Sequence, residues 1–105
     1  AVGLANADSH VVRSGVASPA ELDDYRARGA QAVVAGRFLD ADGGEMAGPL
    51  DGRSIGISPS DLRAIPKRIV VSAEPARAMA LRAALRGGFA THLITDIRSA
   101  QLLLG

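Results

Sequence analysis

The sequence predicts an α/β fold built around a mainly parallel sheet with flanking helices. Short apolar segments that suit strands alternate along the chain with segments of helical spacing, an order typical of parallel α/β sheets. Three of the strand segments are apolar throughout, as expected for strands covered on both faces: "AVGLA", "RIVVSA" and "HLITD". At 105 residues the chain has the size of one modest domain.

Local signals define the elements in order. The helix at 18–28 starts with a capping box, because Ser18 can cap it and Glu21 lies three residues later; Ser58 begins a second helix in the same way. Glycine, proline and aspartate in residues 41–52 turn the chain, so the next strand most simply forms a hairpin with the strand before it. In order, we expect strands at 1–6, 31–40, 53–58, 67–73 and 91–96, and helices at 18–28, 58–66, 74–88 and 97–105.

Composition excludes several classes of protein. The hydrophobic fraction of 48% and the formal net charge of +1 describe an ordinary globular domain, not a nucleic-acid-binding arm. The absence of cysteine excludes disulfides and cysteine zinc sites and is compatible with a reducing cytoplasm. No apolar stretch approaches the roughly 20 residues that span a bilayer. We therefore expect no membrane contact. His10 and His92 have no acid at ligand spacing, so we expect no bound metal. We also expect no cofactor.

A candidate site follows from the predicted sheet. In parallel α/β sheets, ligands bind in a crevice beyond the carboxyl ends of the strands. Polar side chains that follow the predicted strands are therefore the candidate ligand-binding residues; they are Asn6, Arg37, Glu74, Arg77, Thr95 and Asp96.

Arg77 is the most informative of these candidates. If Pro75 starts the helix, Arg77 lies in the first turn, where the backbone dipole already presents positive charge. An arginine there makes a strong anion site when a phosphate or carboxylate arrives. The alternative is a simple ion pair of Arg77 with Glu74 or Asp96. Asp96 is equally well explained as the N-cap of the last helix.

Several ordered motifs resemble one known family. They are "GRFLDADG", "IGIS", "LRAIP", "IVVSA", "ALRAALRGG" and "HLITD". Together they are similar to the C-terminal part of the sugar-binding domain of SorC-family transcriptional regulators. The segments "VVRSG" and "ELDDYRARGA" also resemble the part that precedes it, so the resemblance covers nearly the whole chain.

The resemblance implies a fold and a function. The effector domain of this family is Rossmann-like and similar to phosphosugar isomerases, and its effectors are sugars, commonly phosphorylated. Residues 1–105 would be the C-terminal portion of that domain, which is incomplete here, and the start at Ala1 without methionine agrees with this expectation. The regulator would be a cytoplasmic homo-oligomer and not an enzyme. It would contact DNA only through a helix-turn-helix that this chain lacks.

The family's functional positions match this chain only in part. Arg77 takes the position of a lysine that serves the effector's anionic group, while Ala73 and Glu74 replace two glycines before it. A carboxylate at residue 74 repels a phosphate unless a cation neutralises it. Val33 replaces an acid that hydrogen-bonds sugar hydroxyls. Thr95 and Asp96 match the family's "TD" at the end of the last parallel strand.

Two alternative functions stay open at this point. A fragment of a phosphosugar isomerase-like enzyme rests on fold analogy alone. A ligand-free oligomerisation module is compatible with Val33 and Glu74. If the chain is the later part of a larger α/β domain, apolar surface that the absent part would cover should border the opening strand and should favour self-association.

Overall fold

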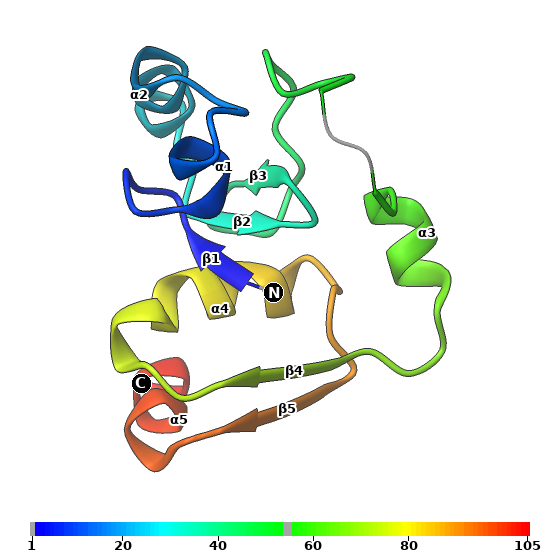
Figure 1. Ribbon diagram of the computed structural model, residues 1–105. Coiled ribbons are helices and arrows are strands. Elements are labelled where there is room, and N and C mark those ends of the chain that lie inside the picture. The colour runs from blue at the N-terminus through cyan, green and yellow to red at the C-terminus, as the bar shows by residue number, and fades with distance from the viewer. Residues whose placement is uncertain (1, 54–55) are drawn as a thin grey trace.

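The computed structural model describes residues 2–53 and 56–105. Its strands form two separate sheets, a three-stranded sheet of order β1-β2-β3 and a two-stranded sheet of β4 and β5 (Figure 1). In chain order the elements are β1 (Val2–Leu4), α1 (His10–Arg13), α2 (Pro19–Ala27), β2 (Ala32–Val34), β3 (Arg37–Leu39), α3 (Pro59–Ala64), β4 (Ile69–Ser72), the 3-10 turn η1 (Pro75–Arg77), α4 (Ala78–Arg86), β5 (His92–Thr95) and α5 (Ile97–Leu104).

The first sheet is antiparallel, so the prediction of a mainly parallel sheet is wrong. The single strand expected at 31–40 is a hairpin, in which β2 pairs antiparallel with β3 and Val34 lies opposite Arg37. The two residues between them, Ala35 and Gly36, have φ of 51° and 74°. Positive φ at both central residues is what a type I′ turn requires, and its twist matches that of the paired strands. β1 joins the other edge of β2, also antiparallel.

Among the described strands, only β4 and β5 pair in parallel, with Ile69 opposite His92. They are joined through η1 and α4, the helical crossover that parallel neighbours need. The carboxyl ends of β1 and of the β4–β5 pair thus belong to different sheets and not to one parallel sheet, as was expected.

Other predicted elements are confirmed or revised. Both helix starts have their expected caps: Ser18 and Glu21 form a reciprocal capping box, and Ser58 Oγ accepts from the backbone N–H of Asp61 at 3.1 Å. The hairpin strand expected at 53–58 includes residues 54–55, which lie outside the described residues. The described residues on either side of them hold no strand, and β3 instead makes an isolated bridge between Leu39 and Glu45.

Helix α4 joins the two sheets. It lies between the antiparallel sheet and the β4–β5 pair (Figure 1), and it contacts β1, β2 and α5. Ala80, Ala83 and Ala84 on this helix are fully buried and pack in one cluster with side chains of β2 and β3. Alanine lets the helix approach the sheet closely, because it has no side-chain atoms beyond Cβ.

The closest approach lies at the end of α4. A Cβ atom placed on Gly43 would lie 2.2 Å from the backbone nitrogen of Gly87 and 2.3 Å from the carbonyl oxygen of Ala83. The turn at residues 40–44 therefore rests directly on the backbone of the helix C-terminus. Only a glycine at residue 43 permits this contact.

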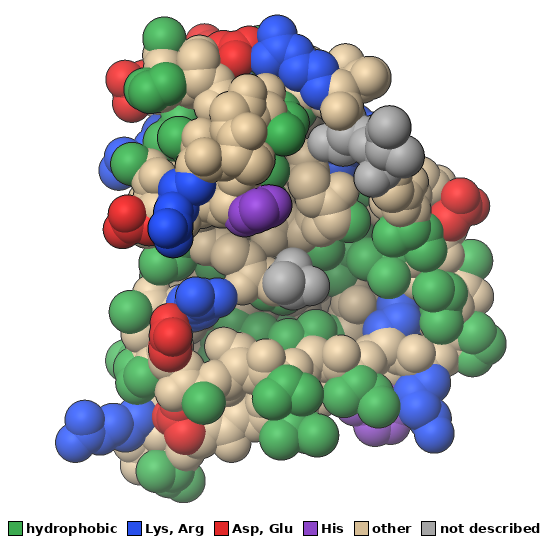
Figure 2. All heavy atoms as spheres, in the orientation of Figure 1, with side chains coloured by type: hydrophobic (Ala, Val, Ile, Leu, Met, Phe, Trp, Pro, Cys, Tyr) green, Lys and Arg blue, Asp and Glu red, His purple; other side chains and the backbone are tan. Residues whose placement is uncertain are grey.

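The outer face of β4 and β5 is open to solvent, although both faces were expected to be covered. Ile69, Val71 and Ile94 are 55%, 71% and 60% exposed. Hydrophobic side chains gather over these two strands on the face shown in Figure 2. This exposed apolar surface lies on β4 and β5, whereas it was expected beside the opening strand. Among the described residues, none of the helices has the length and apolar character needed to cross a membrane.

Candidate functional site

Three of the predicted site residues line one cavity of about 620 Å³: Asn6, Glu74 and Arg77. The cavity lies where β1, α1, the β2–β3 turn and the segment before α4 meet. Basic, acidic and histidine side chains surround the hollowed face of the molecule in Figure 2. The remaining lining residues are Val2, Gly3, Leu4, Asp8, Ser9, His10, Val11, Arg13, Val33, Ala35 and Gly36.

Arg77 is held in a closed ion pair. Its Nε donates to Glu74 Oε2 at 2.7 Å, and its Nη1 donates to the carbonyl oxygen of Val2 at 3.4 Å. Arg77 is the last residue of η1 and the N-cap of α4, so the α-helix starts at Ala78, three residues later than Pro75. The ion pair with Glu74, one of the two alternatives for Arg77, is thus present. Its positive charge is already neutralised beside the cavity.

Asn6 and Val33 give the cavity two different walls. The Oδ1 atom of Asn6 accepts from the backbone N–H of Asp8 at 3.0 Å, which fixes the turn between β1 and α1. Val33, at the position where the family pattern has an acid, lines the cavity from β2. The wall at Val33 is therefore apolar, and the Val33 side chain offers sugar hydroxyls no hydrogen-bond partner.

The other three predicted residues lie elsewhere. Arg37 on β3 pairs with Glu45 at 3.2 Å and with Asp51 at 3.3 Å. Thr95 Oγ1 donates to the carbonyl oxygen of Ser72 on the neighbouring strand. None of the three lines the cavity described above.

Asp96 is the N-cap of α5, as the alternative interpretation held. Its Oδ1 accepts from the backbone N–H of Ser99 at 2.7 Å, and its Oδ2 accepts from Ser99 Oγ at 3.1 Å. Both carboxylate oxygens are thus engaged at the start of α5, one with the backbone and one with the side chain of Ser99.

Sequence reasoning missed the contribution of α1. No helix or strand was expected between residues 7 and 17, but His10–Arg13 is a short helix that places His10 and Arg13 at the cavity. Their spacing of three residues was a signal for this, because residues three apart share a helix face. Ser9 also lines the cavity, and its buried Oγ has no hydrogen-bond partner in the described part of the chain.

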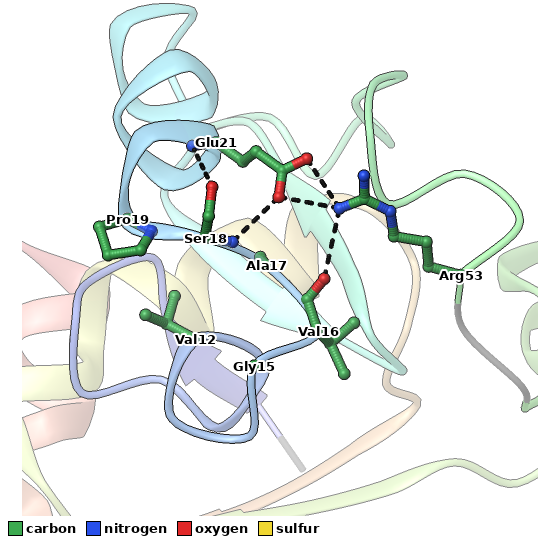
Figure 3. Close-up of a pocket in the computed structure, with 8 residues that line it drawn as sticks. All are labelled: Val12, Gly15, Val16, Ala17, Ser18, Pro19, Glu21 and Arg53. Carbon is green, nitrogen blue, oxygen red and sulfur yellow. Dashed lines mark hydrogen bonds and ion pairs between the residues drawn. The ribbon is translucent and has the colours of Figure 1, made fainter.

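A second hollow of about 600 Å³ lies beside the start of α2 (Figure 3). Arg53 Nη1 donates to Glu21 Oε1 at 2.8 Å and to Oε2 at 2.7 Å, and it also reaches the carbonyl oxygen of Val16. The hydrogen bond from Arg53, helped by the backbone N–H of Ser18, lowers the pKa of Glu21 to about 2. Because Glu21 is committed to this pair and to the capping box, we assign this hollow a structural role.

The fold matches that of a sugar-binding domain. Residues 1–105 match the Sugar-bind family model, described as "Putative sugar-binding domain". The chain therefore belongs to this family, and the relatives that it matches are transcriptional regulators, SorC among them.

Individual relatives of the chain include both curated regulators and solved structures. The chain is 37% identical over 98% of its length to the transcriptional regulator YjhU of Escherichia coli (strain K12), and it spans 31% of that protein. A crystal structure from a transcriptional repressor of Vibrio fischeri is 31% identical, with a TM-score of 0.86 over 98% of this chain and 42% of that one. The full-length sorbitol operon regulator SorC from Klebsiella pneumoniae shares the fold, at 24% identity and a TM-score of 0.85 over 99% of this chain and 34% of that one. The chain thus spans about a third of the length of the full-length regulators it matches.

Proposed function

We propose that residues 1–105 are the C-terminal portion of an effector domain that binds a sugar or a sugar phosphate in the cavity beside Arg77. Membership of the sugar-binding family and the naming of the relatives as transcriptional regulators support this proposal. Binding would change the operator affinity of a DNA-binding part outside this chain, because an effector shifts an equilibrium between two states that it binds unequally. Such a regulator acts in the cytoplasm and is not an enzyme.

The observation that carries the proposal is the meeting of Asn6, Glu74 and Arg77 at one cavity. A sugar hydroxyl both donates and accepts hydrogen bonds. The carboxylate of Glu74 supplies acceptors, the guanidinium of Arg77 supplies donors, and the amide of Asn6 can supply both. The closed pair also limits the ligand, because a doubly charged phosphate at Arg77 must displace or share Glu74.

Calorimetric titration of the regulator that contains this domain tests the assignment. Arg77→Ala should weaken sugar binding by about 1.5–3 kcal/mol, the usual contribution of a hydrogen bond to a charged group. Glu74→Gly should strengthen the binding of sugar phosphates, because it releases the positive charge of Arg77. Arg26→Ala, an exposed arginine on α2 away from the cavity, is the control. Unchanged affinities in both site variants would mean that the segment before α4 is only a helix start.

A second candidate function is oligomerisation without a ligand. The exposed apolar face of β4 and β5, formed by Ile69, Val71 and Ile94, favours it. The two functions are compatible, since a homo-oligomeric regulator can bind its effector and also use this face for assembly. If the chain is only an oligomerisation module, the protein should self-associate, and none of the cavity variants should change the binding of any sugar.

A further inference from the structure

The α1 side of the cavity carries hydrogen-bond donors that the fold does not use. The side chain of Arg13 makes no hydrogen bond and no ion pair with any other described residue, and it is exposed. Ser9 is 8% exposed, and its Oγ has no partner in the same part of the chain. A buried hydroxyl without a partner is costly unless water or a ligand satisfies it. His10 adds a third polar side chain to this wall.

The charges around the cavity are unevenly distributed. Arg77 is neutralised by Glu74 at 2.7 Å, whereas the positive charge of Arg13 is not compensated by a described acid. Asp8, the other acid that lines the cavity, would repel an anion placed beside it. An anionic group therefore gains most from a position against Arg13 and His10, which lie three residues apart on one face of α1.

We propose that Ser9, His10 and Arg13 form the anion subsite of this cavity. It would bind the phosphate of a sugar phosphate or the carboxylate of a sugar acid, because the planar guanidinium of arginine matches both groups with paired hydrogen bonds. The ion pair of Glu74 and Arg77 then faces the hydroxyl groups of the same ligand. This inference rests on the proposed function, since it requires that a sugar occupies the cavity.

Calorimetry on the regulator that contains this domain tests the subsite with matched ligands. For four-, five- and six-carbon skeletons, the series compares the neutral sugar, its aldonate and its phosphate, with inorganic phosphate as a further probe. We expect an anionic member to bind most tightly. Arg13→Ala should weaken that ligand about 10- to 100-fold, as expected for a lost charge-assisted hydrogen bond, and should weaken the matched neutral sugar less than about twofold.

Two further variants sharpen the result. Arg13→Gln keeps a polar side chain and should also lose the preference for the anion, while the exposed Arg26→Ala should retain it. Whether the aldonates or the phosphates bind more tightly shows which anionic group, carboxylate or phosphate, the subsite prefers. Equal affinity for the anionic ligand in Arg13→Ala and Arg26→Ala would overturn the subsite while leaving sugar binding intact. Failure of the unmodified regulator to bind any ligand of the series would overturn sugar binding and the subsite together.

Discussion

The contact between Gly43 and the end of α4 predicts an unusually large effect of one methyl group. Gly43 has φ of 82°, and an L-residue in this region costs about 1–2 kcal/mol. In Gly43→Ala the new Cβ would also lie 2.2 Å from Gly87 N, well inside the roughly 3.5 Å of a normal van der Waals contact. The atoms that this Cβ would meet belong to the backbone, so the turn or the helix must move, at a further cost of about 1–3 kcal/mol. We therefore expect Gly43→Ala to lower the free energy of unfolding by about 2–5 kcal/mol.

Two other glycines separate the backbone conformation from the close contact. Gly15 and Gly52 have φ of 82° and 81°, and an added Cβ on either meets no described atom within 4 Å. In urea unfolding, Gly15→Ala and Gly52→Ala should each lower the free energy of unfolding by about 1–2 kcal/mol, the cost of the backbone conformation alone. The reasoning about the helix contact fails if Gly43→Ala is destabilised no more than these two variants.

Three further predictions concern acid stability, the core and the exposed sheet face. The pKa of Glu21 is lowered from its usual 4.5 to about 2 by Arg53, so its stabilising effect is complete above about pH 5 and is lost as the pH falls towards 2; Glu21→Gln should flatten the stability curve between these values in urea titrations. Tyr25→Phe should lower the free energy of unfolding by about 1–3 kcal/mol, because the buried backbone N–H of Leu50 loses its acceptor at 3.0 Å; equal chemical stability of the two proteins would contradict this role. Val71→Lys should reduce self-association in sedimentation velocity with little change in stability, since this side chain is 71% exposed; an unaltered association constant would show that β4 takes no part in assembly.

Local signals were the most reliable part of the sequence prediction. The caps at Ser18 and Ser58 depend only on residues three apart, and both are present. The turn at Ala35 and Gly36 was missed, because alanine is an unusual residue at positive φ and the sequence lacks the favoured Asn-Gly pair. That one turn makes β2 and β3 antiparallel neighbours, which no count of apolar residues could reveal.

The site was predicted in part, for a reason that needs revision. Asn6 and Arg77 were selected as residues beyond the ends of parallel strands, yet they meet because α4 packs across β1 of the antiparallel sheet. The α1 residues escaped notice because the helix has only four residues and no acid in its first turn to mark its start. Tertiary packing, rather than any local motif, brings His10 and Arg13 to the same cavity.

The type I′ turn has a consequence for the thermodynamics of recognition. Ala35 and Gly36 form part of the cavity wall, and the strand pairing on either side of them is anchored by the buried Val34 and Phe38. This wall is preorganised, so a ligand that packs against it gains contact without an entropy penalty for ordering backbone. The entropy cost instead falls on Arg13, since immobilising such a side chain costs about 0.5–1.5 kcal/mol. Shape discrimination would then reside in the rigid hairpin, and the affinity for charge would be set by how readily one arginine is immobilised.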